Sequence, residues 1–219
     1  QALQRTAKIE KPKLLPALAA SNPWHYRNRI RLQVAKEGRI GFYKIASNEV
    51  VEIDQCLIAE EKINAQLKAA KNRAQELLKK DRNARYEIEL SVFEEKPRQA
   101  ASTSSEMSFS QVNTQQNEVL KNRVIEILNL KKEDSLLELY AGEGNFSFDL
   151  ASKAASVLAV EMNGAAVEKA RARIRKEHVK NLNFLESSSA RALIDLGKSS
   201  LSFNKLLLDP PRSGAEECI

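Results

Sequence analysis

The chain has 219 residues, 42% hydrophobic and 29% charged, which is typical of a globular protein long enough for two small domains. It contains no apolar run long enough to cross a membrane and no recognisable secretory leader, so neither a membrane protein nor a secreted one is indicated. Its two cysteines, Cys56 and Cys218, are too few for a disulfide framework and indicate a reducing compartment, so we expect a cytoplasmic protein.

The excess of positive charge lies in the first half of the chain. Residues 1–103 hold 20 Lys and Arg against 13 Asp and Glu, whereas residues 104–219 hold 15 against 16. A basic surface attracts a polyanion such as RNA, because neutralised phosphates release their counterions. Charge alone is equally consistent with a role in solubility.

A leading arm is expected over residues 1–21, and a strand follows over residues 26–34. Alternation along this strand puts Arg27, Arg29 and Arg31 on one face and apolar side chains on the other. Guanidinium groups at two-residue spacing lie about 7 Å apart, which suits contacts with successive phosphates of a nucleic acid.

A second strand is predicted over residues 39–45 as the hairpin partner of the first. Tyr43 and Lys44 place a ring and a cation beside the arginines, which suits base stacking next to backbone contacts. An ordinary amphipathic hairpin with a solvated charged face would show the same pattern, and this alternative stays open.

The next segments complete a small α+β domain. The sequence predicts a third short strand at 49–53, a long helix at 57–80 with an apolar stripe of 3.6-residue period, and a half-buried strand at 85–93. Residues 94–106 are polar and rich in Ser, Pro and Gln, which is typical of a linker, and we place the domain boundary near residue 103.

One βαβ unit dominates the second half. Residues 135–139 form an apolar strand, a glycine turn follows at 141–144, a helix begins near residue 145, and a second strand at 157–160 ends at Glu161. The glycines let the backbone approach a ligand, and Glu161 has about the spacing at which such folds bind ribose hydroxyls. A nucleotide-free α/β sheet with the same turn is an alternative.

A second indication of a ligand-binding α/β sheet is the segment 203–212, FNKLLLDPPR. Its apolar run at 206–208 predicts a strand buried on both faces, and Asp209 follows at the carboxyl end, where open α/β sheets bind ligands. Two prolines then stop the strand. With a strand predicted at 182–185, the second half has four expected strands.

The motifs SFSQVN, LYAGEGNF, VLAVE and LLLDPPR occur in this order, and the chain resembles the RNA uracil-C5 methyltransferases. The resemblance starts at NPWHYRNRIRL, continues through GFYK and VVEIDQC, and covers nearly the whole chain from about Asn22. It implies an α/β fold with an incomplete Rossmann-like class I methyltransferase domain over residues 104–219, preceded by a smaller, basic, RNA-contacting α+β domain over residues 22–103.

The family makes 5-methyluridine in transfer and ribosomal RNA, so the resemblance implies S-adenosylmethionine as cofactor and RNA as partner, with no obligate protein partner. Gln111 would reach the methionine part of the cofactor, Glu161 the ribose, and Ser188 the adenine, while Asp209 would close the pocket near the target base. The implied cofactor residues are Gln111, Tyr140, Gly142, Asn145, Glu161, Ser188 and Asp209. The implied RNA contacts are Arg27, Arg29, Arg31, Tyr43 and Lys44.

Without the resemblance, Gln111 would fall in a polar loop whose Asn113 caps a helix predicted over residues 115–130. Many family members also hold a [4Fe–4S] cluster with four cysteines, and Cys56 matches the last of them. One thiolate cannot hold such a cluster, so we expect no metal in this chain and a cluster only in a longer form. Cys56 is either an orphan ligand or a buried core residue.

The resemblance also implies a cysteine nucleophile that adds to C6 of uracil, so that C5 can attack the methyl group before a base removes the C5 proton. Cys218 is too close to Asp209 and lacks the Asn-Pro that follows the family's nucleophile. We therefore expect no catalytic residue in this chain, with the nucleophile and base after Ile219. Two alternatives remain, a methyltransferase acting on an exocyclic base amine of RNA and a non-catalytic RNA-binding protein.

Overall fold

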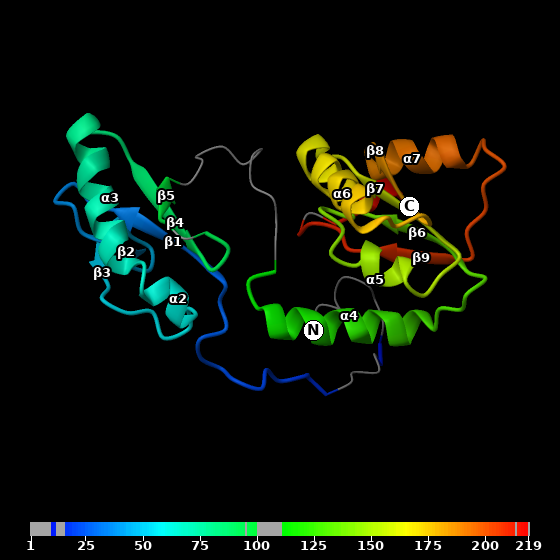
Figure 1. Ribbon diagram of the computed structural model, residues 1–219, viewed down its shortest axis with the longest axis horizontal. Coiled ribbons are helices and arrows are strands. Elements are labelled where there is room, and N and C mark those ends of the chain that lie inside the picture. The colour runs from blue at the N-terminus through cyan, green and yellow to red at the C-terminus, as the bar shows by residue number, and fades with distance from the viewer. Residues whose placement is uncertain (1–9, 12–15, 95, 100–110, 213, 219) are drawn as a thin grey trace.

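The computed structural model describes residues 10–11, 16–94, 96–99, 111–212 and 214–218. Figure 1 shows two domains, each built around its own sheet, with the first in blue to green and the second in green to red. The predicted order, an α+β part followed by an α/β part, is confirmed. Among the described residues, no helix is both long and apolar enough to cross a lipid bilayer.

The first domain is an antiparallel sheet with two helices against it. The sheet has five strands in the order β3-β2-β1-β4-β5. Its elements are β1 (Arg29–Val34), β2 (Ile40–Tyr43), β3 (Val50–Glu52), α2 (Glu61–Asn64), α3 (Leu67–Lys80), β4 (Tyr86–Ser91) and β5 (Arg98–Gln99).

The core of this domain follows the predicted alternation. Ile30 pairs with Leu90 and Leu32 with Ile88 across β1 and β4, and all four side chains are buried. The apolar stripe of α3 packs on the same face. Cys56 is buried in this core, which agrees with the interpretation of it as a core residue.

The predicted helix over residues 57–80 is interrupted between α2 and α3. The Asn64 side chain accepts from the N–H of Cys56 and donates to its C=O, which ties the end of α2 to the preceding loop. The Gln66 amide donates to the C=O of Ser91 at 2.9 Å. These hydrogen bonds to distant backbone override the helical periodicity, which carries no information about them.

Two other boundaries differ from the prediction. The first strand begins at Arg29 rather than at residue 26, and Arg27 forms isolated bridges with Ala59 and Asn113. Part of the predicted linker, β5, pairs with β4 at the edge of the sheet. Residues 95 and 100–110 of the linker region, like residues 1–9 and 12–15 of the arm, lie outside the described residues.

The second domain is a parallel sheet of four strands in the order β8-β7-β6-β9. Each strand lies within a residue of its predicted range. The elements are α4 (Thr114–Leu128), β6 (Ser135–Leu139), α5 (Ser147–Ala151), β7 (Ser156–Glu161), α6 (Gly164–Glu177), β8 (Leu182–Glu186), α7 (Ser189–Leu196), β9 (Lys205–Leu208) and the short 3-10 helix η2 (Glu216–Cys218).

Helices cover both faces of this sheet. Leu136 and Val157 face a core that includes residues of α4, α5 and α6, whereas Leu137 and Val160 face α7. Because both faces are covered there, the central strands β6 and β7 are largely apolar. The edge strand β9 differs, since Leu206 is 49% and Leu208 40% exposed, so the prediction that it is buried on both faces is wrong. Within β6 one charged residue is buried, Glu138, with only 2% of its surface exposed.

The Glu138 carboxyl group is held by one hydrogen bond, donated by Oγ of Ser147 at 2.6 Å. Burial raises the pKa of Glu138 to about 8, and the nearby charge of Asp209 adds to the rise, while the bond from Ser147 opposes it. Glu138 is therefore mostly protonated at neutral pH in the folded protein, and ionised in the unfolded chain.

This difference predicts that stability falls with rising pH. Between about pH 4.5 and 8 the folded state holds one proton more than the unfolded state at this site, so the Glu138 contribution to the free energy of unfolding should fall by about 1.4 kcal/mol per pH unit. Above the folded pKa it should level off. Urea unfolding of wild type and Glu138→Gln from pH 5 to 9 measures the difference, with the exposed Glu168→Gln as control. Parallel curves for wild type and Glu138→Gln would contradict the assignment.

Candidate cofactor site

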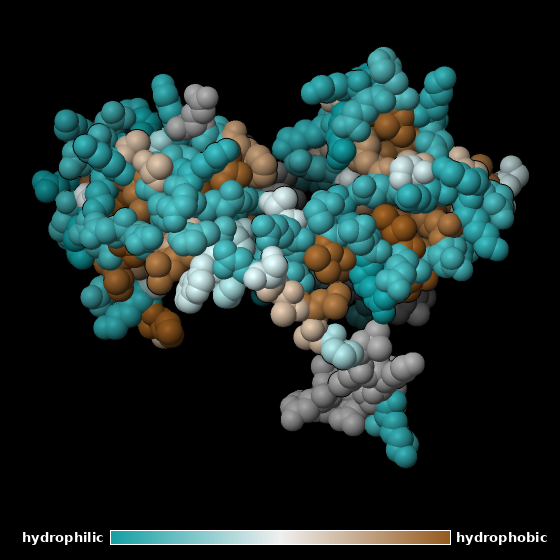
Figure 2. All heavy atoms as spheres, turned by 60° about the horizontal axis from the view of Figure 1, so that its bottom comes forward, coloured by the Kyte–Doolittle hydropathy of each residue, from teal (hydrophilic) through white to brown (hydrophobic). Residues whose placement is uncertain are grey.

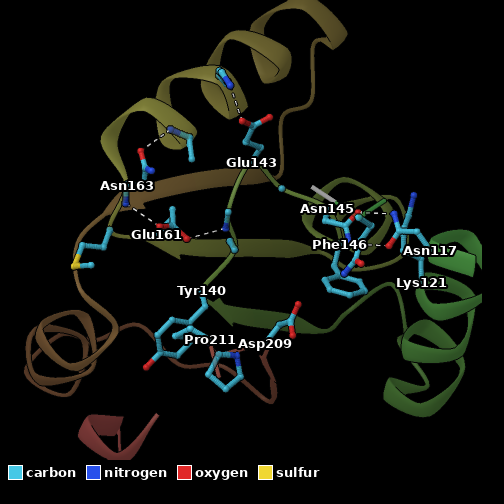
Figure 3. Close-up of a pocket in the computed structure, with 18 of the residues that line it drawn as sticks. Asn117, Lys121, Tyr140, Glu143, Asn145, Phe146, Glu161, Asn163, Asp209 and Pro211 are labelled. Atoms are coloured by element: carbon cyan, nitrogen blue, oxygen red, sulfur yellow. Dashed lines mark hydrogen bonds and ion pairs between the residues drawn. The ribbon is translucent and has the colours of Figure 1, made fainter. Parts of the chain in front are cut away.

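A cavity of about 1180 Å³ opens at the carboxyl ends of β6, β7 and β9 (Figure 3). Glu161 and Asp209, which come from different strands, open onto this same space. The carboxyl ends of strands are where open α/β sheets bind ligands. All seven predicted cofactor residues line this one cavity: Gln111, Tyr140, Gly142, Asn145, Glu161, Ser188 and Asp209.

The turn after β6 has a left-handed backbone at three positions, with φ of +62° at Tyr140, +58° at Gly142 and +89° at Gly144. Such a conformation costs a non-glycine residue of the order of 1 kcal/mol, and it is common at functional sites. A Cβ on Gly142 would meet no atom within 4 Å, whereas one on Gly144 would lie 2.8 Å from the Phe148 ring. Gly142 therefore leaves room at the cavity, and Gly144 allows close packing beneath it.

Glu161 is fixed at the edge of the cavity by two backbone hydrogen bonds. Its Oε2 accepts from the N–H of Gly142 and its Oε1 from the N–H of Asn163, both at 2.8 Å (Figure 3). Each carboxylate oxygen can accept a further hydrogen bond. The group is thus oriented to receive two hydroxyl donors from a ligand.

Two predicted residues make hydrogen bonds within the protein that the sequence did not indicate. Asn145 exchanges hydrogen bonds with the Asn117 amide of α4, at 2.8 and 3.1 Å. Ser188 Oγ accepts from the N–H of Arg191 and so caps α7, which leaves its hydroxyl proton available to a ligand. The predicted cap of α4 is also present, because Asn113 Oδ1 accepts from the N–H of Gln116.

Asp209 and the prolines after it form another part of the wall. Figure 3 shows Tyr140, Asp209 and Pro211 on the same side of the pocket. The Tyr140 hydroxyl lies 3.2 Å from Sγ of Cys218, and Cys218 itself does not line the cavity. Within the described residues, no cysteine lines the cavity and no group of His, Cys, Asp or Glu is arranged to hold a metal ion.

The sequence did not indicate that the first domain also contributes to the cavity, through Asn28 and Phe93. Asn28 is 3% exposed, and its amide nitrogen donates to the C=O of Gln111 and to Oγ1 of Thr114, both at 3.0 Å. The sequence did contain one indication of this contact. Asn28 lies two residues before Ile30, so the alternation puts both side chains on the buried face. A polar residue in that phase indicates a buried polar contact.

The predicted RNA-contacting residues lie outside the cavity. Arg29, Arg31 and Arg98 converge on the buried Glu89, with N–O distances of 3.8, 3.0 and 2.6 Å. Burial alone would raise the pKa of Glu89, but hydrogen bonds from Arg98 and Arg31 outweigh it and hold that pKa below its usual value. Two arginines of the predicted row, Arg29 and Arg31, are therefore ion-paired with Glu89.

The other predicted contacts lie further along the hairpin. Tyr43 is 42% exposed, and Lys44 lies 3.6 Å from the Glu49 carboxylate in a solvent-exposed pair. Figure 2 shows that hydrophilic residues cover most of one face of both domains. Both side chains are accessible, so contact with RNA at this hairpin remains a prediction.

The order β8-β7-β6-β9, with a glycine turn and a carboxylate at neighbouring strand ends, is that of a Rossmann-like methyltransferase domain. The crystal structure of a Pyrococcus abyssi tRNA (uracil-54, C5)-methyltransferase in complex with S-adenosyl-L-homocysteine has this fold. It matches with a TM-score of 0.65 and 19% identity, over 90% of this chain and 63% of that one.

Residues 87–219 match the family model of tRNA (Uracil-5-)-methyltransferase, and the chain belongs to this family. A 23S rRNA (uracil(1939)-C(5))-methyltransferase RlmD of Haemophilus parainfluenzae is 28% identical over 96% of this chain and 61% of its own length. An uncharacterized RNA methyltransferase of Bdellovibrio bacteriovorus is 34% identical over 93% of this chain and 51% of its own length. The resemblance seen in the motifs is confirmed, and the chain spans between half and two thirds of these relatives.

Proposed function

We propose that the protein transfers a methyl group from S-adenosylmethionine to C5 of a uridine in RNA. One observation carries the proposal: three separate motifs, contributing Gly142, Glu161 and Asp209, open onto a single cavity in a chain of the uracil-5-methyltransferase family. The names of its relatives include both tRNA and 23S rRNA enzymes, so the proposed substrate class is transfer or ribosomal RNA.

The residues present fit the cofactor. The open space beside Gly142 admits a ligand close to the backbone, and Glu161 offers two oriented acceptors to the ribose hydroxyls. Ser188 at the start of α7 keeps a hydroxyl donor for the adenine end, and Gln111 lies before α4 for the methionine end. S-adenosylmethionine supplies an electrophilic sulfonium methyl group when it is bound.

Uracil C5 needs activation before it can accept that methyl group. In the reaction that family membership suggests, a thiolate forms a bond to C6, C5 takes the methyl group, and loss of the C5 proton to a base releases the thiolate. Neither described cysteine is placed to serve, because Cys56 lies in the core of the first domain and Cys218, which contacts the Tyr140 hydroxyl, does not line the cavity. The described residues thus offer no thiolate at the cavity.

The decisive experiment follows the C5 proton. Full-length protein is incubated with RNA that carries tritium at uridine C5 and with ¹⁴C-methyl S-adenosylmethionine, and both labels are counted. We expect one tritium released to water for each ¹⁴C-methyl group incorporated. Incorporation without tritium release would point to methylation of a base amine, and no incorporation would point to a non-catalytic RNA-binding protein.

The cofactor site is tested separately on this chain by calorimetry with S-adenosylhomocysteine, which has the same ribose. Glu161→Gln keeps the side-chain shape but removes the charge that strengthens two hydrogen bonds, so we expect binding to weaken by about 10- to 100-fold. Glu168→Gln, on the exposed face of α6, is the matched control and should bind as wild type does. Equal affinity of Glu161→Gln and wild type would contradict the assignment of the ribose site.

RNA contact at the hairpin gives a salt-dependent prediction. If Lys44 contacts a phosphate, Lys44→Ala should weaken RNA binding and lower the slope of log affinity against log salt concentration by about 1. If Tyr43 stacks on a base, Tyr43→Ala should weaken binding and leave the slope unchanged. Fluorescence anisotropy with single-stranded RNA across a KCl series measures both, with the exposed Lys68→Ala as control. Wild-type affinity and slope in both variants would exclude this hairpin from the RNA interface.

A further inference from the structure

The wall of the cavity contains an exposed phenylalanine that belongs to the other domain. Phe93 follows β4 at the end of the first domain and is 73% exposed, yet it lines the cavity at the strand ends of the second domain. A single exposed apolar residue on an open surface needs no explanation. A ring contributed by one domain to the ligand cavity of another is a different case, because it adds an aromatic side chain to the wall that a ligand would touch.

Hydrogen bonds on both sides fix the backbone that carries this ring. The N–H of Phe93 donates to Oγ of Ser91 at 3.1 Å, and the Gln66 amide donates to the C=O groups of Ser91 and Glu94. The preceding residue, Val92, donates its N–H to the C=O of Asn28 at 3.0 Å. The backbone around Phe93 is thus fixed to Asn28, whose side chain forms hydrogen bonds to Gln111 and Thr114 at the start of the second domain.

The size of the cavity leaves room for a second occupant. Its volume of about 1180 Å³ exceeds the roughly 300–1,000 Å³ of an ordinary small-molecule site. The ribose and adenine residues proposed above, Glu161 and Ser188, are both supplied by the second domain. The first domain contributes Asn28, which is buried, and Phe93, which is exposed and stands apart from those two residues.

We propose that Phe93 is a stacking platform for the nucleobase that enters the cavity from the RNA. Proteins recognise single-stranded RNA by stacking splayed bases on aromatic rings, and an enzyme that modifies a base must take it out of its stack. Uracil has a flat π face but few atoms with which to fill a pocket, so a ring beside it holds it in a defined plane. The proposal rests on the proposed function, since it names a contact to the target base.

The test compares two short RNA strands of equal length, one with a single uridine between abasic ribose phosphates and one fully abasic. We expect wild type to bind the first more tightly, and Phe93→Ala to lose about 5- to 100-fold in affinity for the first and nothing for the second. Phe93→Leu should behave like the alanine variant, because it is apolar but has no ring face, and Phe93→Trp should restore binding.

Controls separate this proposal from the others. Leu57→Ala removes an exposed apolar side chain away from the cavity and should bind both strands as wild type does. S-adenosylhomocysteine affinity should be unchanged in Phe93→Ala, and a loss would overturn the proposal by placing the ring against the cofactor. Equal binding of the two strands by wild type, or full binding by the alanine or leucine variant, would also overturn it. Failure of the proposed function would instead appear as absent tritium release or absent cofactor binding, with the Phe93 effect on RNA intact.

Discussion

The hydrogen bond from the backbone of Gly142 to the carboxylate of Glu161 connects two strand ends, and the geometry of the cavity depends on it. It can form because β6 and β7 are parallel neighbours in which Leu139 pairs with Val160, so the turn after one strand lies beside the end of the other. A neutral side chain could accept the same bond. A carboxylate can in addition accept from Asn163 and still have lone pairs directed to the cavity.

A second constraint joins the domains. Asn28 uses both N–H groups of its amide on residues at the start of the second domain, and its backbone N–H donates to the C=O of Val112 at 2.9 Å. These hydrogen bonds fix the orientation of the amide. Because the C=O of Asn28 also accepts from the N–H of Val92, they hold the neighbouring Phe93 close to the cavity. The oxygen of the same amide is buried and has no hydrogen-bond partner among the described residues, an arrangement that costs about 1–3 kcal/mol. Asn28 therefore connects the two domains by hydrogen bonds, and its unpaired oxygen lowers the stability of the folded protein.

The parts of the fold that sequence reasoning found are those that depend on local pattern. Alternation located Ile30 and Leu32 in the core, and apolar runs located the four parallel strands, because burial on one or two faces imposes a short period on the sequence. The cofactor residues that were predicted from the motifs all line one cavity. The features that sequence reasoning missed depend on contacts between residues far apart in the chain. An example is the interruption of the predicted helix, where the side-chain amides of Asn64 and Gln66 form hydrogen bonds to the backbone of Cys56 and Ser91. No periodicity within a segment encodes such partners.

The cluster at Glu89 shows why an alternating row of arginines on a strand need not be solvated. Glu89 lies directly opposite Arg31 in the register of β1 and β4, and Arg29 and Arg98 reach the same carboxylate from either side. Arg98 also pairs with Glu94 at 3.3 Å. An isolated surface arginine loses much side-chain freedom when it binds a phosphate, but a guanidinium already held by Glu89 has lost most of that freedom during folding. Ion pairing with a buried acid thus orders these guanidinium groups on folding, and contact of Arg29 and Arg31 with RNA stays a prediction.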